Sequence, residues 1–401
     1  MKVVVAPDSF KETMSAAQVA ARMAAGVRQV WPGARVRQLP MADGGEGTLS
    51  VLVQALGGTV EGVTTVDAMG RGQRACLGWV AASHLAVVEV AQAVGLEQVL
   101  AADRNVMRAS SAGVAALLTR ALELGARRII VGLGGSATND GGVGMLRGLG
   151  ARFYSEDGAP FHPTAESLGR LARVELSPTI RKLQEVDIVL ACDVDNPLTG
   201  PQGASAVFGP QKGATATQVK ILERNLANWG GILEKTTGTD WAAAPGAGAA
   251  GGLGFAFMAA LGARRDQGAK VVAEAISLEA QLADADLVIT GEGAIDSQTL
   301  RGKTISWVAH LAALYDVPIV AVGGSLRPGY ENLLQGGFTA VLTTVRRVGQ
   351  LPEILATAPQ DLEQTTADAC RLINLGLSLA GKKTLPSSPG IPQKAERQNN
   401  S

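Results

Sequence analysis

One arrangement of residues recurs along this sequence, and its residue types suit phosphoryl chemistry. An apolar run ends, and a loop of glycine, carboxylates, hydroxyl groups and lysine follows. The loops of this kind are "APDSFKE", "MADGGEGT", "GLGGSATNDGG", "ACDVDNPLTG" and "ITGEGAIDSQTLRGKT". Glycine lets the backbone approach a ligand, while backbone N–H groups and lysines bind phosphate. Carboxylates hold magnesium or accept a proton from a hydroxyl group, so the set predicts phosphoryl transfer.

The charged members of these loops are the candidates for that chemistry. The cations in or beside the loops are Lys11, Lys212, Arg301 and Lys303. The carboxylates at predicted strand ends are Asp8, Asp43, Glu46, Asp140, Asp193, Glu292 and Asp296.

Asp193 is the candidate general base, because it directly follows the apolar run "VLAC". The alternative is a turn in "DVDNP", which Asp195 or Asn196 would form equally well. Ser9 and Lys11 follow the first apolar run, and Lys11 is the candidate for neutralising a phosphate or carboxylate. A solvated surface lysine is the alternative interpretation.

Two further loops carry paired functional groups. Asp43 and Glu46 are three residues apart around two glycines and would hold magnesium, or cap the helix that follows. Asp296 and Lys303 would bind phosphate with Thr299, or form an ion pair on the surface.

Glycines in two loops would bring backbone N–H groups to an anion. Gly134 and Gly135, with the Ser136 hydroxyl group, suit a small carboxylate or a phosphate. Gly291 and Gly293 precede Asp296 and would approach the nucleotide phosphates. The sequence leaves open whether the Gly134 loop binds substrate or nucleotide.

The composition of the 401 residues argues against several classes of protein. The 36 basic and 36 acidic side chains balance, and aromatic residues are 4%, so a nucleic acid or an anionic membrane is not the expected partner. The three cysteines and three histidines are scattered, which predicts a reducing cytoplasm and neither disulfides nor zinc. "KVVVAPDSF" does not resemble a signal peptide, and the uncharged segment 241–263 is mostly Ala and Gly, so we expect a buried helix there.

The elements that must position these loops alternate between strand and helix over residues 1–55 and again near the end of the chain, which predicts a parallel sheet. Residues 60–90 contain close-set apolar runs separated by turns and predict antiparallel strands. The predicted fold class is therefore α/β, with two domains, one of them Rossmann-like and discontinuous and the other a mixed insert. The Rossmann-like domain comprises residues 1–60, 100–135 and 265–380, the insert comprises 61–99 and 136–264, and 382–401 is a disordered tail.

A dinucleotide site is the competing interpretation of residues 132–137, which satisfy G-x-G-x-x-[GA], with Glu156 and Asp157 roughly 20 residues further on. However, Asn, Asp and Gly at 139–142 are poor helix formers where that site needs a helix. A nicotinamide-dependent oxidoreductase and a non-enzymatic anion sensor remain the alternatives to a kinase.

Six long stretches, in this order, resemble the bacterial glycerate kinases of the glycerate-degradation type. They are "VVVAPDSFKETMSA", "LPMADGGEGT", "VGLGGSATNDGG", "ACDVDNPLTGPQGASAVFGPQKGA", "PGAGAAGGLG" and "ITGEGAIDSQTLRGKT". The resemblance runs from residue 2 to about residue 379. It implies two α/β domains with the active site in the cleft between them.

The resemblance also implies an activity and its cofactors: transfer of the γ-phosphoryl group of ATP to D-glycerate, with Mg²⁺. The product would be 2-phosphoglycerate, with 3-phosphoglycerate as the alternative. Arg71 would then bind the glycerate carboxylate through two parallel hydrogen bonds, or else lie on the surface of a hairpin. The oligomeric state is open, and a homodimer is one candidate.

Overall fold

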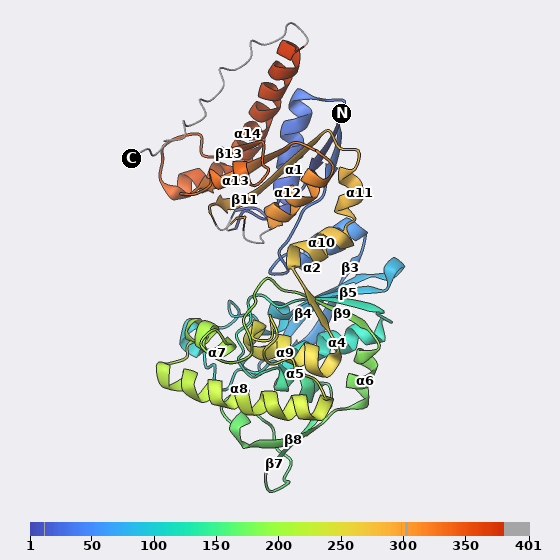
Figure 1. The fold of residues 1–401 in the computed structure, drawn as a ribbon, viewed down its shortest axis with the longest axis vertical. Coiled ribbons are helices and arrows are strands. Elements are labelled where there is room, and N and C mark those ends of the chain that lie inside the picture. The colour runs from blue at the N-terminus through green and yellow to red at the C-terminus, as the bar shows by residue number, and fades with distance from the viewer. Residues whose placement is uncertain (12, 298, 301–303, 381–401) are drawn as a thin grey trace, which may run out of the picture.

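The structure, a computed structural model, describes residues 1–401 except 12, 298, 301–303 and 381–401. Lys303 and the predicted tail 382–401 therefore lie outside the described residues. The chain folds into two lobes, each built on its own sheet (Figure 1).

The first sheet joins the two ends of the chain. Its strands in spatial order are β13 (Ala340–Thr343), β12 (Ile319–Leu326), β11 (Leu287–Ile295), β1 (Lys2–Val5) and β2 (Arg35–Gln38). All neighbouring strands are parallel. This confirms the prediction that the two ends share a parallel sheet.

Helices cover both faces of this sheet, so its central strands are apolar on both sides. One face packs on α1 (Ala16–Val30) and α14 (Leu351–Ala380), with Val3 and Val5 in that core. The other packs on α12 (Thr304–Leu314), α13 (Asn332–Gln335), α11 (Leu278–Leu282) and α10 (Gly268–Ala275). The Ser15 side chain caps α1 and accepts a hydrogen bond from the Gln18 N–H.

The second sheet contains the rest of the strands that position the site. In spatial order they are β10 (Arg264–Asp266), β9 (Asp187–Ala191), β6 (Arg128–Gly132), β5 (Leu85–Glu89), β4 (Gly72–Val80) and β3 (Thr59–Val66). The strands β3, β4 and β5 are antiparallel neighbours, which confirms the prediction for residues 60–90. From β5 to β10 the pairing is parallel.

The placement of β6 differs from the predicted grouping of residues 100–135 with the chain ends. β6 pairs with β5 and β9 in the second sheet. Residues 59–266 thus contribute every strand of that sheet. The sequence "RIIVG" is a buried parallel strand in either arrangement, so its hydrophobic pattern does not say which sheet it joins.

Helices pack around the second sheet and fill the lower lobe (Figure 1). They are α3 (Val90–Val94), α4 (Ala112–Glu123), α5 (Val143–Gly148), α6 (Pro178–Gln184), α7 (Ala204–Phe208), α8 (Ala216–Thr237) and α9 (Ala249–Leu261). The hairpin of β7 (Arg152–Ser155) and β8 (Leu171–Glu175) lies at the far end, and Trp229, Phe153 and Phe255 are fully buried in this core.

Two segments connect the lobes. The chain leaves β2 for α2 (Thr48–Leu56), and it returns from β10 through α10 to the first sheet. Both α2 and α10 lie between the lobes in Figure 1 and share one core with residues of both sheets. Within the described part of the chain, none of the helices has the length and apolar character needed to cross a bilayer.

Candidate active site

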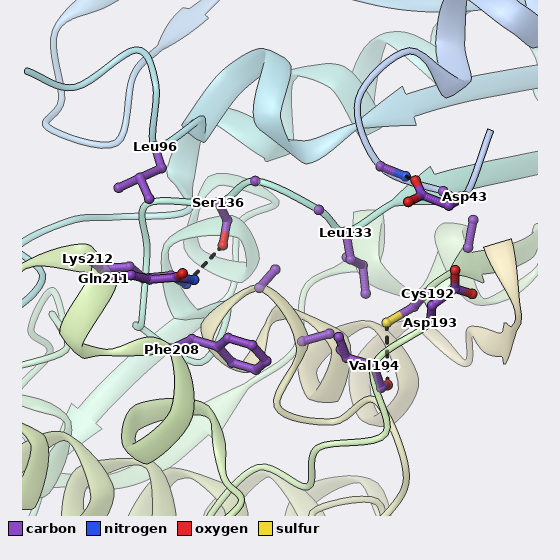
Figure 2. Close-up of a pocket in the computed structure, with 17 residues that line it drawn as sticks. Asp43, Leu96, Leu133, Ser136, Cys192, Asp193, Val194, Phe208, Gln211 and Lys212 are labelled. Carbon is purple, nitrogen blue, oxygen red and sulfur yellow. Dashed lines mark hydrogen bonds between the residues drawn. The ribbon is translucent and has the colours of Figure 1, made fainter. Parts of the chain in front are cut away.

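A pocket of about 260 Å³ lies at the carboxyl edge of the second sheet, where the loops after β9 and β6 meet the segment after β2 (Figure 2). It is lined by Asp43, Gly44, Gly45, Leu96, Leu133, Gly134, Gly135, Ser136, Ala191, Cys192, Asp193, Val194, Phe208, Gln211, Lys212, Ala249 and Ala250. Ligand sites in α/β proteins occupy this edge of a sheet. The volume is slightly below the ~300–1,000 Å³ typical of small-molecule sites, which suits a compact ligand.

Asp193 lies one residue beyond Cys192, directly after β9, and its carboxylate faces the pocket (Figure 2). Its Oδ1 accepts a hydrogen bond from the Gly268 N–H at 2.7 Å. Burial among the loops, reinforced by the nearby charge of Asp43, raises the pKa of Asp193 to about 6. A carboxylate with this pKa is ionised at neutral pH yet basic enough to accept a proton.

The turn at Asp43 reaches the pocket because glycine allows it to press onto the second sheet. Gly44 has φ +83°, and a Cβ there would lie 2.6 Å from the Ala191 carbonyl oxygen. The buried carboxylate of Glu89, at the end of β5, accepts the Leu49 N–H at 2.7 Å and so anchors the start of α2. Burial raises the pKa of Glu89.

Gly268 closes the same corner from the second connecting segment. A Cβ at this residue would lie 1.8 Å from the Asp43 carbonyl oxygen, so the two segments that join the lobes are in backbone contact here. The contact places the Gly268 N–H against Asp193. No side chain larger than hydrogen fits without moving Asp43.

The loop after β6 supplies the opposite wall of the pocket. Gly134, Gly135 and Ser136 line it, as does Lys212 from the short 3₁₀ turn Pro210–Lys212. The buried Lys212 Nζ donates to Ser136 Oγ at 3.1 Å and to the Thr138 carbonyl oxygen at 2.7 Å. Burial lowers the pKa of Lys212 to about 7, against a smaller opposing effect of Asp140.

Asp140, from the same loop, has a structural role in this geometry. Its buried carboxylate accepts the Ser111 N–H and hydroxyl groups at 2.8 and 2.9 Å, and the N–H groups of Gly142 and Gly144 at 3.1 Å. Burial raises its pKa. β6 ends at Gly132 and α5 begins only at Val143, so the loop does not lead directly into a helix as a dinucleotide site requires.

A second group of predicted residues gathers at the carboxyl edge of the first sheet. Ser9 and Lys11 follow β1, and Gly291 and Gly293 lie within β11 next to them. The Asp8 N–H donates to the Gly291 carbonyl oxygen at 2.8 Å. A Cβ on Gly293 would lie 3.3 Å from the backbone nitrogen of Lys11, so the two backbones are in close contact.

Hydroxyl groups bind the carboxylates of this second group. Thr304 Oγ1 donates to Asp8 Oδ2 at 2.6 Å, and Thr299 Oγ1 donates to Glu292 Oε1 at 2.6 Å. The Asp296 N–H donates to Thr299 Oγ1 at 3.1 Å. Lys303, the predicted partner of Asp296, lies outside the described residues.

Asp43 links the two groups electrostatically. Its negative charge raises the pKa of Asp193 on one side and contributes to the raised pKa of Asp8 on the other, where burial is the larger cause. Asp43 is therefore within electrostatic range of Asp8, which follows β1 of the first sheet, and of Asp193, which follows β9 of the second.

Two predicted residues lie elsewhere. The Arg71 guanidinium group pairs with Asp67 at 2.6 Å and Asp103 at 3.3 Å beside the β3–β4 hairpin, and Arg71 does not line the pocket. Glu46 is exposed and also outside the pocket lining, and its charge acts on Glu89.

Sequence reasoning gave no role to three residues that shape the pocket. Lys212 stood among the loop cations only by its type, although "GPQKGA" lies within a long stretch of the resemblance. Phe208, whose ring lines one wall, lies in the same stretch, but nothing in its residue type predicted a place in the pocket. Gly268 lies outside the six stretches, and its importance comes from the backbone that the fold brings against it.

The described residues contain no group of three or more His, Cys, Asp or Glu side chains placed to hold a metal ion. Mg²⁺ does not need such a group, since it keeps several waters and binds one or two carboxylates plus substrate phosphates. The negative charge of Asp43 raises the pKa of both Asp8 and Asp193, so negative charge accumulates around Asp43. This excess of negative charge fits a divalent cation.

Comparison with known proteins matches residues 3–374 to the glycerate kinase family. The chain is 42% identical over 379 residues to a glycerate kinase of Bacillus subtilis, covering 94% of this chain and 99% of that protein. It is 39% identical over 381 residues to a glycerate 2-kinase of Escherichia coli, covering 95% and 100%.

The fold agrees with a solved structure at similar identity. A crystal structure described as a "putative glycerate kinase 2" from Salmonella typhimurium LT2 superposes with a TM-score of 0.87 at 40% identity, covering 94% of this chain and 99% of that one. Because family, relatives and fold agree along nearly the whole length, the chain belongs to the glycerate kinase family and is a phosphotransferase.

Proposed function

We propose that the protein transfers the γ-phosphoryl group of ATP to the 2-hydroxyl group of D-glycerate, giving 2-phosphoglycerate and ADP. The observation that carries the proposal is the Asp193 carboxylate, which faces a compact pocket with a pKa raised to about 6. The relative from Escherichia coli that bears the name glycerate 2-kinase supports the 2-phosphate product.

In this mechanism Asp193 accepts the proton of the substrate hydroxyl group as its oxygen bonds to the γ-phosphorus atom. The bond between that phosphorus atom and the bridging oxygen of ADP breaks, and ADP leaves. The Gly268 N–H holds the Asp193 carboxylate in place through Oδ1, which leaves Oδ2 to take the proton. Gly134, Gly135 and Ser136 bind the acid on the opposite wall of the pocket.

The nucleotide phosphates bind at the carboxyl edge of the first sheet in this proposal. Ser9 and Lys11 offer a hydroxyl group and a cation there, beside the glycine backbone of β11. Lys11 neutralises charge on the transferred phosphoryl group. Asp296, Thr299 and Lys303 complete the proposed phosphate contacts.

Asp43 is the carboxylate proposed for Mg²⁺, because it lies between the two groups and its negative charge acts on both. Glu46 is left out, since it lies outside the pocket lining. A bound Mg²⁺ neutralises phosphate charge and so eases displacement.

The test is turnover of ATP with D-glycerate and Mg²⁺, with phosphorus NMR of the product. A 2-phosphoglycerate signal supports the proposal, and a 3-phosphoglycerate signal moves the reacting hydroxyl group to C3. Absence of turnover in folded protein refutes it. Incubation without glycerate is the control, since it measures hydrolysis of ATP by water.

A further inference from the structure

Lys212 is a buried cation at the end of the pocket opposite Asp193 (Figure 2). An ammonium group carries three N–H donors. Within the described part of the chain, the Lys212 Nζ donates to Ser136 Oγ at 3.1 Å and to the Thr138 carbonyl oxygen at 2.7 Å. This accounts for two donors, so the third is available to a group in the pocket.

No carboxylate in the described part of the chain lies within ion-pair distance of Lys212. Asp140 is the carboxylate that acts on it, and the oxygens of Asp140 already accept from Ser111, Gly142 and Gly144. A buried ammonium without an ion pair is unfavourable unless a ligand supplies the charge. Lys212 lines the pocket, so an anion bound there reaches it.

We propose that Lys212 and Ser136 form the subsite that binds the substrate carboxylate, with the backbone of Gly134 and Gly135 beside them. The subsite rests on the proposed function for the identity of the acid. It also orients the substrate, because a carboxylate at Lys212 directs the hydroxyl end of the molecule toward Asp193 across the pocket. Lys212 is thus a substrate-binding residue, and it takes the role that the sequence assigned to Arg71.

The subsite has a measurable consequence, which is uptake of a proton on binding. In the free protein burial lowers the pKa of Lys212 to about 7, so the side chain is mostly neutral at pH 8. A bound carboxylate favours the ammonium form and raises that pKa. The other titratable groups in or beside the pocket are Asp140, Asp193, Cys192 and Asp43. Asp140 is buried and saturated with donors, and Asp193 is ionised at pH 8. Burial raises the pKa of the Cys192 thiol, which therefore stays neutral at pH 8.

Calorimetric titration of the full chain with D-glycerate, without nucleotide, tests this in two buffers of different ionisation enthalpy. At pH 8 the unmodified protein should take up close to one proton per glycerate bound, and Lys212→Met should abolish the uptake. Lys212→Met should also weaken glycerate binding by about 10- to 100-fold, the effect of one hydrogen bond to a charged group. The Michaelis constant for glycerate should rise more than kcat falls.

Lys220→Met is the matched control, because Lys220 is exposed on α8 and the chemical change is the same. It should bind glycerate with the affinity and proton uptake of the unmodified protein. If Lys212→Met does not fold, the proposal is tested by the proton uptake of the unmodified protein and by the glycerate affinity of Ser136→Ala. Ser136→Ala should weaken binding while keeping the uptake.

Glycerate binding without proton uptake at pH 8, or unchanged affinity in folded Lys212→Met, overturns the proposal. The proposal is also overturned if inorganic phosphate binds with uptake of a proton while glycerate binds without it. The subsite would then hold the phosphoryl group and not the substrate carboxylate. Proton-linked binding of glycerate without turnover of ATP refutes the proposed function and leaves the carboxylate subsite standing.

Discussion

Replacing Asp193 with asparagine tests the assignment of the general base. The asparagine side chain would keep an oxygen acceptor for the Gly268 N–H, so the loop after β9 should keep its position. It would lose the ability to accept a proton. General-base catalysis contributes about 10²- to 10⁴-fold to rate, so kcat should fall by that factor, or about 3–5 kcal/mol of transition-state stabilisation.

The pH dependence gives a second and sharper readout. The pKa of Asp193 is raised to about 6, so about a tenth of the protein has the ionised base at pH 5 and about nine-tenths at pH 7. The value of kcat/KM should therefore rise about tenfold per pH unit below pH 6. It should fall again above about pH 7 as Lys212 loses its proton, giving a bell-shaped profile.

The assay couples ADP formation to a spectrophotometric readout between pH 5 and pH 9. Asp195→Asn is the control, because Asp195 lies in the same loop, is 79% exposed and pairs with Arg265 at 2.6 Å. That surface ion pair contributes about 0–1 kcal/mol to stability, and turnover should not change. Normal turnover in Asp193→Asn, or loss of activity confined to Asp195→Asn, would refute the assignment.

The Asp193→Asn substitution should raise the stability of the fold at neutral and higher pH although it lowers kcat. A carboxyl group whose folded pKa lies above its ordinary 3.8 binds more protons in the folded state, so it destabilises the fold progressively as the pH rises from about 4 to about 6. The amide of the asparagine variant does not titrate in this range. The Asp193→Asn protein should therefore unfold at a higher temperature than the unmodified protein at pH 8, with the difference shrinking toward pH 4.

The remaining predictions concern the residues that hold the site together and the ions that complete it. Gly268→Ala places a Cβ 1.8 Å from the Asp43 carbonyl oxygen, so it should cost about 1–3 kcal/mol of stability in denaturant titration and reduce kcat. Gly231→Ala, at an exposed position in α8 with open space around it, should not destabilise the fold. Asp140→Ala removes the acceptor for several buried donors and should cost about 3 kcal/mol or more by denaturant titration. Lys11→Met should lower kcat/KM for ATP by about 10- to 100-fold in initial-rate measurements, with stability unchanged because Lys11 is exposed. Chelation by EDTA should abolish turnover and excess Mg²⁺ restore it, while Asp43→Asn should raise the Mg²⁺ concentration needed for half-maximal rate.

The sequence predicted the strands that are buried on both faces, because their apolar runs are uninterrupted. "KVVV" and "LVIT" became central strands of the first sheet. Predicted polar groups follow the first of them, whereas β11 continues to Ile295, so Gly291, Glu292 and Gly293 of the predicted loop belong to the strand. The strand β10, with the sequence "RRD", gave no such signal. It is a three-residue edge strand held by parallel pairing with β9, so its identity depends on the sheet and not on its own composition.

Grouping of elements into sheets was less predictable than the elements themselves. β6 has the same apolar character as β1, and a pattern of buried residues contains no information on which neighbour the strand selects. The antiparallel run from β3 to β5 was easier, since short connections restrict each strand to pairing with the next.

In the candidate site, too, residues next to a strand were predictable from the sequence, and residues that depend on tertiary packing were not. Asp193 and Ser136 were predictable because each follows a strand, and the carboxyl ends of parallel strands share one edge. Lys212 comes from a 3₁₀ turn far along the chain, and it becomes a buried cation only when that turn packs on the loop after β6. Arg71 had the right chemistry for a carboxylate, but Asp67 is close enough to bind it first.

The position of the pocket follows from how the chain passes between its two sheets. It crosses once after β2, through Asp43, and once after β10, through Gly268, and the two crossings touch at the Asp43 carbonyl oxygen. Asp193 is hydrogen-bonded to one crossing and shares its electrostatic environment with the other. These two segments connect the lobes, so any movement of one lobe relative to the other must shift them. Such a movement therefore changes the surroundings of Asp193. A base placed at this contact is sensitive to the arrangement of both lobes, although all of its pocket neighbours except the Asp43 turn belong to the second lobe.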